Sequence, residues 1–524
     1  MENKRASWGS NLGFIMAAIG SAVGLGNIWG FPYKMGRSGG FTFLLIYILL
    51  AVFVGMVIMC SELALGRKTG TGVVGAYRAV SKKFKWVGWL GILSPFLIMS
   101  FYTVLGGYCF QYMSLNMAEL SFGLSNIFGA SIDGSTTFGS MLTNPFGCAV
   151  FTLLFLGLCM VIVKGGVSEG IEKFNKIGMP ALFVMLIVVI VRSLTLPHAE
   201  EGLKYMFVPG YAVKAGFTDE TPSVISVLAT AGGQMFFSLS LAMGAMITYG
   251  SYLDKKENIV KNSALIVVAD SVVALMAGLA VIPAAVANGI ASGTPLNEIA
   301  LGGPKLLFVT LQDVFANMGP LGPLFGIVFY LLVIIAAISS AISLMEVVAA
   351  HFIDKAAEKG RKVQRSTVTL WVSFAILIEA LLVAVDGLGA NGVWVPLQGL
   401  FSEGLPMFND CWLDFMDFFS EGLMMPLGAM VMALMVGWEL KPALLLDEIH
   451  HGEHSPAFSV FYTICIKFIC PVVMAFVLAG QLIDFFTCPQ TAAYIEPLCY
   501  ALSAAALIAF WLLAALGNKK TAKI

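Results

Sequence analysis

The sequence predicts an all-α polytopic membrane protein with about 12 transmembrane helices. Hydrophobic residues make up 58% of the 524 residues, charged residues make up only 12%, and the mean hydropathy is +0.88. A soluble protein of this length needs more polar surface than that. Apolar runs of more than about 18 residues, the length that crosses a bilayer, also recur along the chain. The lipid bilayer is therefore the expected surrounding, and 30 basic against 31 acidic residues give no reason to expect a nucleic-acid partner.

Hydropathy and periodicity set the expected helices in chain order. They cover residues 11–36, 41–65, 88–115, 146–164, 175–195, 223–251, 261–287, 319–353, 367–385, 410–437, 456–481 and 493–515. Basic residues gather in alternate connections, and by the positive-inside rule both termini are cytoplasmic. On the opposite side, the connection 288–318 contains the apolar-periodic stretch PKLLFVTLQDVF, which predicts a short helical lid on the outer face.

The first expected helix contains the stretch GSAVGLGNIWGFPYK, residues 20–34, with four glycines and one bare asparagine. Gly20 and Gly24 are spaced as in close helix packing, but that reading leaves the other two glycines unexplained. A break near the middle of the membrane frees backbone N–H and C=O groups. Such groups are tolerated only where they line a cavity or bind a ligand. The first helix is therefore predicted to be unwound at a binding site.

A second candidate break lies in the sixth expected helix, GQMFFSLSLAMGAMITY, where Ser238, Ser240 and Gly244 interrupt an apolar run. Serine hydroxyls that bond back to the preceding turn explain this pattern equally well. Interruptions in the first and sixth helices together indicate two five-helix halves of opposite topology, a pattern typical of secondary transporters. The expected division of the single transporter domain, 1–524, is a first repeat at 11–195, a second repeat at 223–437, and two further helices at 456–515.

Three motifs carry a resemblance to a known family. GSAVGLGNIWGFPY, GQMFFSLSLAMGAMITYGSY and AAISSAISLMEVVAAHFID resemble the first, sixth and eighth helices of the neurotransmitter:sodium symporter family, in its bacterial amino-acid transporter branch. The resemblance runs from about residue 5 to residue 420. It implies helices 1–5 and 6–10 as inverted repeats, with helices 1 and 6 unwound. It also implies a sodium-coupled symporter that works by alternating access in the bacterial inner membrane, as a monomer or weak homodimer.

The resemblance implies two bound Na⁺ ions and no organic cofactor. The second sodium site would use the carbonyls of Gly20 and Val23 together with Ala336, Ser339 and Ser340 of the eighth helix. The last three stand at i, i+3 and i+4 and therefore share one helix face. Carbonyl and hydroxyl oxygens are ligands that a hard cation accepts. A serine pair on a helix face also serves as a packing contact between helices.

The first sodium site would use the Ala22 carbonyl, the Asn27 amide, Ser238 and Asp270, completed by the carboxylate of the substrate. Asp270 lies in the seventh expected helix, and an ionisable residue at bilayer depth is a functional candidate by default. The alternative is a carboxylate near the end of the helix that reaches water.

Chloride is expected to be dispensable. Family members that require chloride have a neutral amide where Asp270 aligns and a small polar group where Ala274 aligns. The other chloride neighbours, Tyr47, Gln234 and Ser238, are nevertheless present. The fixed negative charge of Asp270 is therefore expected to replace the anion, while the ion stoichiometry and any proton counter-transport stay open.

Gly24 indicates the class of substrate. Family members that carry monoamines have aspartate at this position, whereas glycine leaves room for the carboxylate of an α-amino acid. The amine would meet Ser340, and the carboxylate would meet Gly26 and Tyr102. The matched side-chain pocket consists of Leu25, Ile98, Tyr102, Phe237, Ser240, Met243 and Leu344, and Ser238 is also expected to contact the substrate. This lining has no charged side chain, which favours a neutral hydrophobic amino acid and leaves leucine-like and aromatic substrates open.

The gates show one departure from the family. Gly30 stands where the family has an arginine that pairs across the outer vestibule with the aspartate matching Asp417. Lys34 lies one turn later and is expected to reach toward Asp417 or Asp414. The inner gate is expected to be intact, with Arg5 and Trp8 opposite Asp354, and Ser251 and Tyr252 at the end of the sixth helix.

Two other classes of function are weighed against a transporter. The segment DEIHHGEH places His450, Glu453 and His454 in the H-x-x-E-H spacing of a zinc peptidase. Gly452 interrupts that stretch, and zinc ligation requires both histidines on one rigid helix face, so an enzyme is not expected. An amino-acid sensor or channel built on the same fold is the other alternative. Accumulation of substrate against its gradient separates a transporter from both.

Overall fold

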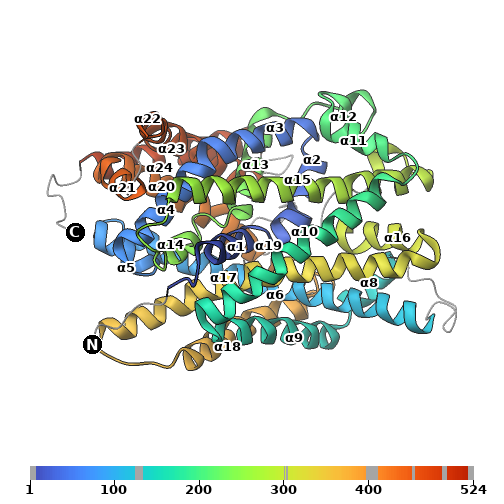
Figure 1. Cartoon of the computed structure of the whole chain (residues 1–524). Coiled ribbons are helices and arrows are strands. Elements are labelled where there is room, and N and C mark those ends of the chain that lie inside the picture. Colours follow the sequence, from blue (N-terminus) through green and yellow to red (C-terminus); the bar gives the residue numbers. More distant parts are fainter. Residues whose placement is uncertain are drawn as a thin grey trace.

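The computed structural model describes residues 7–123, 134–299, 301, 305–396, 411–450, 455–486 and 492–516. Within these residues the chain forms helices joined by turns and loops, and no strand occurs (Figure 1). The expected all-α class is therefore confirmed.

Ten continuous helical segments in the described residues are long and apolar enough to cross a membrane. They are α3–α4 (Phe41–Thr69), α6 (Lys85–Phe122), α9 (Pro145–Lys164), α10 with its first turn (Val167–Leu194), α15 (Ile259–Ala291), α17 (Gly322–Glu358), α18 (Arg365–Asp386), α19–α20 with the turn that follows (Trp412–Glu439), α22–α23 (Pro456–Phe486) and α24 (Ala492–Ala515). The protein is therefore a polytopic membrane protein. Several helices exceed their expected bounds; α6, for example, continues to Phe122 because its last turns are too polar to register in a hydropathy window.

The first span is broken as expected. Helix α1 (Asn11–Ala22) ends where Val23 adopts an extended conformation, and the chain resumes as a π-helical turn (Gly26–Gly30) and α2 (Phe31–Arg37). The two pieces meet at an angle of 46°. Together they make an eleventh span.

The sixth expected helix is also broken. Helix α13 (Val224–Ser238) and helix α14 (Ala245–Gly250) are separated by six non-helical residues. In that gap Ser240, Ala242 and Gly244 have positive φ values of 52°, 59° and 77°. The first two lack glycine's freedom to adopt such angles, and strain of this kind is typical of functional sites. At Gly244 a side chain would also lie 2.7 Å from the Gly91 carbonyl oxygen, so glycine is required there.

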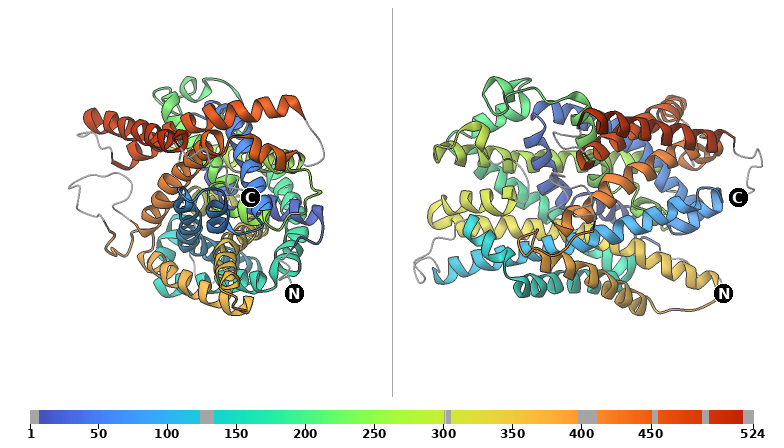
Figure 2. Two further views of the ribbon diagram at one scale, coloured as in Figure 1. Left: turned by 90° about the vertical axis from the view of Figure 1, so that its left-hand side faces the viewer. Right: turned by 180° about the vertical axis from the view of Figure 1, so that it is seen from behind.

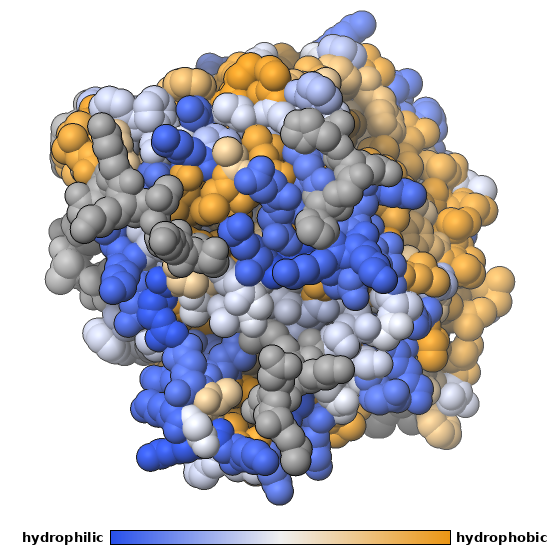
Figure 3. All heavy atoms as spheres, turned by 60° about the vertical axis from the view of Figure 1, so that its left-hand side comes forward, coloured by the Kyte–Doolittle hydropathy of each residue, from blue (hydrophilic) through white to orange (hydrophobic). Residues whose placement is uncertain are grey.

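The shorter helices lie at the two ends of the bundle. Helices α5 (Val73–Val80), α14 and α21 (Ala443–Ile449) lie toward one end, and α8 (Gly134–Leu142), α11 (Ala199–Phe207), α12 (Tyr211–Lys214) and α16 (Leu311–Ala316) lie at the other (Figures 1 and 2). Hydrophilic residues gather on the first of these ends, next to an apolar flank (Figure 3). This division matches a bundle whose flanks face lipid and whose ends face water.

The expected outer lid is present as a helix. A π-helical turn (Leu306–Thr310) leads into α16. The amide of Asn116 on α6 donates to Gln312 Oε1 at 3.1 Å, and the backbone N–H of Gly134 donates to Asp313 Oδ1 at 2.6 Å. These bonds fix α16 against α6 and α8, at the end of the bundle opposite α5.

Candidate functional site

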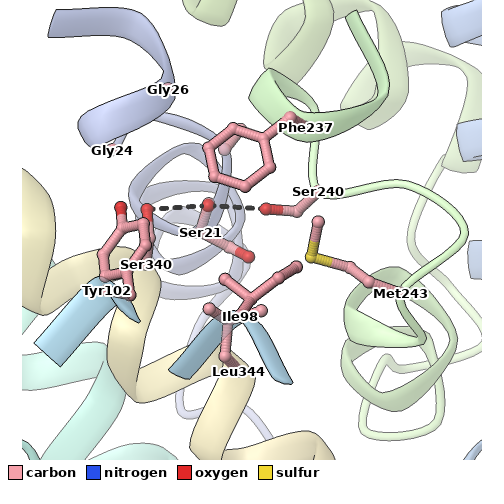
Figure 4. Close-up of a pocket in the computed structure, with 11 residues that line it drawn as sticks. Ser21, Gly24, Gly26, Ile98, Tyr102, Phe237, Ser240, Met243, Ser340 and Leu344 are labelled. Atoms are coloured by element: carbon pink, nitrogen blue, oxygen red, sulfur yellow. Dashed lines mark hydrogen bonds between the residues drawn. The ribbon is translucent and has the colours of Figure 1, made fainter. Parts of the chain in front are cut away.

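A small cavity lies where the two broken helices meet α6 and α17 (Figure 4). Its lining is Ser21, Ala22, Gly24, Gly26, Ile98, Tyr102, Phe237, Ser240, Met243, Ser340 and Leu344. The structure thus brings together all of the predicted substrate residues except Leu25 and Ser238. The cavity volume is about 10 Å³, which is room for one water molecule. A larger guest therefore requires the side chains of Met243 or Phe237 to move.

Ser21 is a lining residue that the sequence argument missed. Its carbonyl oxygen accepts hydrogen bonds from Ser240 Oγ at 2.7 Å and from Ser340 Oγ at 3.0 Å (Figure 4). Its own hydroxyl donates to Ser343 Oγ at 2.8 Å. One residue in the last turn of α1 therefore joins the second break to α17. The available signal was Ser343, which shares the helix face of Ser339 and Ser340 at i+4 and i+3.

Tyr102 and Gly24 define the polar wall of the cavity. The backbone N–H of Leu25 donates to the Tyr102 hydroxyl at 2.8 Å. A Cβ atom at Gly24 would overlap the hydroxyls of Tyr102 and Ser340. Only glycine leaves these hydroxyls in place, so residue 24 cannot carry an acidic side chain without displacing them.

Asp270 is fully buried on α15 and lies beside the first break. Its carboxylate accepts hydrogen bonds from Asn27 Nδ2 at 2.7 Å, Ser238 Oγ at 2.9 Å and the Tyr47 hydroxyl at 3.1 Å. Asn27 Oδ1 in turn accepts from the backbone N–H of Gly24 at 3.1 Å. Asn27, Ser238 and Asp270 of the first predicted ion set are thus connected by hydrogen bonds that reach Gly24 in the cavity wall, and Ala22 lines the cavity. In water-free surroundings such a carboxylate needs either these donors or a cation.

Gln234 and Ala274 are the other residues considered for the expected chloride region. Gln234 Nε2 donates to the Gly26 carbonyl oxygen at 2.7 Å, while its Oε1 is buried and has no hydrogen-bond partner among the described residues. Ala274 is buried one turn after Asp270 and offers no polar atom of its side chain. The carboxylate of Asp270 therefore supplies the negative charge on this side of the cavity.

The second predicted ion set also converges. Ser339 Oγ lies 3.2 Å from the Val23 carbonyl oxygen and 2.8 Å from the Ala336 carbonyl oxygen. Ser340 Oγ lies 3.3 Å from the Gly20 carbonyl oxygen. Five oxygen atoms of neutral groups from α1 and α17 therefore meet at the start of the first break. This oxygen-only chemistry suits a hard monovalent cation.

The outer vestibule contains an ion pair that differs from the predicted one. The ammonium group of Lys34 pairs with Glu421, one turn after Asp417 on the same helix. Asp414 and Asp417 line the same cavity of about 300 Å³, together with Arg37. The sequence predicted Asp417 or Asp414 as the partner, and Glu421 was missed. The i+4 spacing of Glu421 from Asp417 was the signal that identifies a second acid on that face.

The inner end of the bundle is closed by an aromatic cluster and a buried ion pair. Trp8 Nε1 donates to the Tyr249 carbonyl oxygen at 3.2 Å, and its ring contacts Tyr252 edge to face. The Tyr252 hydroxyl donates to Glu346 Oε1 at 2.8 Å, and Glu346 pairs with Arg365. The Glu346–Arg365 pair was not predicted; Glu346 lies in the eighth expected helix and Arg365 in the connection that follows it.

Other predicted inner-gate residues are placed only in part. Asp354 Oδ2 accepts from the backbone N–H of Gly72 at 2.7 Å, and Ser251 caps the turn after α14 by donating to the Thr248 carbonyl oxygen. Arg5 lies outside the described residues, so its pairing with Asp354 stays a prediction.

The histidine motif of the peptidase alternative is described only at its first residue. His450 Nε2 lies 2.9 Å from Ser459 Oγ, and Glu453 and His454 lie outside the described residues. Within the described part of the chain, no three side chains of His, Cys, Asp or Glu are grouped as metal ligands.

The comparisons with known proteins agree on one family. The model of the sodium:neurotransmitter symporter family matches residues 5–126 and 142–518. A sodium-dependent transporter of Bacillus subtilis (strain 168) is 35% identical over 481 residues, which cover 91% of this chain and 97% of the relative. A sodium-dependent transporter of Methanocaldococcus jannaschii is 31% identical over 451 residues, covering 83% of this chain and 82% of the relative.

A solved structure extends the agreement to three dimensions. The crystal structure of MhsT in complex with L-phenylalanine superposes with a TM-score of 0.76 at 33% sequence identity, covering 91% of this chain and 100% of MhsT. The fold and the sequence motifs therefore indicate the same relatives, which are transporters and not enzymes. The chain belongs to the sodium:neurotransmitter symporter family.

Proposed function

We propose that this protein is a symporter that couples the downhill entry of two Na⁺ ions to the uptake of a neutral amino acid with a hydrophobic or aromatic side chain. The main observation behind this proposal is that two groups of oxygen atoms, the two predicted ion sites, lie beside the same break in the first helix. One contains the buried carboxylate of Asp270, and the other contains neutral oxygens only. Ions at these two places would neutralise Asp270 and hold the broken helix in one conformation.

The side chains near the break support the choice of substrate. Gly24 leaves the hydroxyls of Tyr102 and Ser340 facing the cavity, where they would bind the carboxylate and the amine of an α-amino acid. Ile98, Met243 and Leu344 form an uncharged wall opposite them. Met243 is unbranched and can repack around a large side chain. The relative MhsT was crystallised with L-phenylalanine, which favours the aromatic end of this range.

The same site supports independence from chloride. Two Na⁺ ions and a zwitterion bring two positive charges into a buried site. At an effective dielectric of about 20, two unit charges about 4 Å apart interact by about 4 kcal/mol, so a nearby anion is required. Asp270 supplies it, held by Asn27, Ser238 and Tyr47.

Alternating access follows from closures at both ends of the cavity. The Lys34–Glu421 pair closes the side that carries the lid α16, and the Trp8, Tyr252, Glu346 and Arg365 cluster closes the opposite side. The basic connections support a cytoplasmic position for the second side and for both termini in a bacterial cell. Monomers or weak homodimers in the inner membrane complete the proposal.

Transport into proteoliposomes tests the proposal. Labelled L-phenylalanine and L-leucine are offered to vesicles with an inward Na⁺ gradient, with an equal K⁺ gradient, and with the Na⁺ gradient collapsed by an ionophore. We expect accumulation above the external concentration only with the intact Na⁺ gradient. A sensor would bind the amino acid in Na⁺ without accumulating it, and a channel would equilibrate it without exceeding the external concentration. Equal uptake in Na⁺ and K⁺ would contradict sodium coupling.

A further inference from the structure

A large apolar groove, lined by residues other than those of the transport cavity, lies where α6, α17 and α18 meet. Trp89 and Leu93 of α6, Phe352 of α17, and Trp371 and Ala375 of α18 line it, and its volume is about 770 Å³. That volume falls in the range of about 300–1,000 Å³ that is common for small-molecule sites. None of these residues belongs to the proposed ion or amino-acid sites.

The groove opens to the surroundings of the bundle. Trp89, Phe352 and Trp371 are 45%, 46% and 66% exposed, although they are large apolar side chains. Exposed tryptophans are enriched where a membrane protein crosses from hydrocarbon to headgroup. The flank that carries the groove therefore faces lipid, with its tryptophans close to one membrane surface.

The mouth of the groove is basic. Lys362 lines it, in the connection between α17 and α18. Lys355 Nζ lies 5.9 Å from the centre of the Trp89 ring, at the opposite wall. The nearby acid Glu358 is already paired with Arg78. Within the described part of the chain, Lys362 forms no hydrogen bond or ion pair, so its charge is available to an anion.

The dimensions fit one lipid chain. The lining residues of α18 extend eight positions into the groove from the turn next to Lys362, which corresponds to about 12 Å of helix. Half the hydrocarbon thickness of a bilayer is about 15 Å. An acyl chain that enters beside Lys362 would therefore lie along Trp371 and end near Ala375.

We propose that this groove binds an anionic phospholipid of the cytoplasmic leaflet. Its phosphate would bind Lys362, with Lys355 close by, and one acyl chain would fill the space between α6, α17 and α18. Basic pockets between transmembrane helices on the cytoplasmic side are known to hold anionic headgroups. The proposal does not depend on which amino acid is transported.

Native mass spectrometry of the full-length protein in a mild detergent tests this assignment. Phosphatidylglycerol and phosphatidylcholine with identical acyl chains are titrated in parallel, and the retained lipid is counted per protein. We expect one phosphatidylglycerol to be retained in preference to phosphatidylcholine. Lys362→Gln should reduce that preference about fivefold, because one lysine near a membrane surface contributes about 1 kcal/mol to the binding of anionic lipid.

A second variant fills the groove without changing charge. Ala375→Trp should reduce retention of both lipids, because its indole occupies the end of the acyl-chain path. Matched controls are Lys359→Gln in the same basic connection and Leu370→Trp, which lies on α18 but outside the groove. Both controls should retain lipid as the wild type does. Size-exclusion profiles identify any variant that fails to fold. If either Lys362→Gln or Ala375→Trp fails to fold, the other of these two variants tests the assignment.

Three outcomes would overturn the assignment. Equal retention of both lipids by the wild type would show that lipid covers the groove without selection for an anionic headgroup. Unchanged retention in Ala375→Trp would place the lipid elsewhere. A wild-type dimer that Ala375→Trp converts to a lipid-free monomer would show that a second copy of the chain, and not a lipid, covers the groove.

Discussion

Asp270 joins three helical segments and is the residue on which the proposed transport function depends most. Its three donors, Asn27, Ser238 and Tyr47, come from three different helical segments, so the carboxylate joins them at full burial. A buried carboxylate without such donors would be costly, and removing its charge leaves donors that can bind another anion. The network is therefore suited to accept chloride once the acid is neutralised.

The first prediction follows from this arrangement. Native uptake is expected to be the same with chloride or gluconate outside, while Asp270→Asn combined with Ala274→Ser should require chloride. The amide removes the fixed charge, and the new hydroxyl adds a donor one turn away. Uptake is measured in proteoliposomes with each anion. Ala274→Ser alone is the control and should stay indifferent to chloride; a double variant that is also indifferent would refute the role of Asp270.

Gly24 gives the second prediction at the residue scale. Gly24→Asp should lower amino-acid binding by more than about a hundredfold, because a carboxylate would meet the substrate carboxylate in a dry site and displace Tyr102 and Ser340. Binding is measured by thermal shift in Na⁺. Gly157→Ala, on α9 where no heavy atom would approach the new Cβ within 4 Å, is the matched control. Retained affinity in Gly24→Asp would show that the amino acid binds elsewhere.

At the scale of elements, the sequence predicted what depends on composition and spacing. Both helix breaks were predictable because glycine and serine interrupt otherwise apolar runs, and the α16 lid was predictable from its periodicity. The contacts of Ser21 were not predictable, because they depend on how the last turn of α1 packs against the second break and α17. The partner of Lys34 was missed for a related reason. Asp417 and Glu421 lie one turn apart on the helical segment that begins at Trp412, so spacing alone does not separate them. The packing of α2 against that segment determines that Lys34 pairs with Glu421.

The Lys34–Glu421 pair gives a prediction for the outer gate. The two side chains are only 18% and 9% exposed, so removing one partner leaves a poorly solvated charge. Lys34→Gln should speed release of bound substrate to the outside about tenfold. The double variant Lys34→Glu with Glu421→Lys should bring the release rate part of the way back to the native value. Release of labelled substrate is followed after dilution. Arg78→Gln breaks an ion pair whose partners are 44% and 42% exposed and should leave the rate unchanged.

A release rate that stays at the native value in Lys34→Gln would contradict a gating role for this pair. In that case Asp414 and Asp417, which line the same vestibule, would be the residues to exchange next.

At the scale of the whole molecule, the proposed transport cavity has a set of contacts on each side that would close it. The outer closure joins α2 to the helix that begins at Trp412, and the inner closure joins Trp8, α14, α17 and α18. Helix α17 takes part in the inner closure through Glu346 and in the second oxygen set through Ser339 and Ser340. Opening the inner end therefore disturbs the same helix that would hold Na⁺. Such a shared element couples two sites only if their ligands favour different conformations.

Tyr252 tests this coupling. Its hydroxyl donates to Glu346 Oε1, and a hydrogen bond to a charged group contributes about 1.5–3 kcal/mol. Tyr252→Phe keeps the ring against Trp8 but removes that bond, so the inner end should open more often. Because Na⁺ and substrate would bind the closed form, apparent Na⁺ affinity should fall about fivefold or more. Thermal shifts across a Na⁺ titration measure this apparent affinity.

Tyr462→Phe is the control. It removes another buried hydroxyl, bonded to Ser61 at 2.7 Å, and should lower the melting temperature without changing Na⁺ affinity. Equal Na⁺ affinities in Tyr252→Phe and the wild type would show that the inner closure and the ion sites are independent.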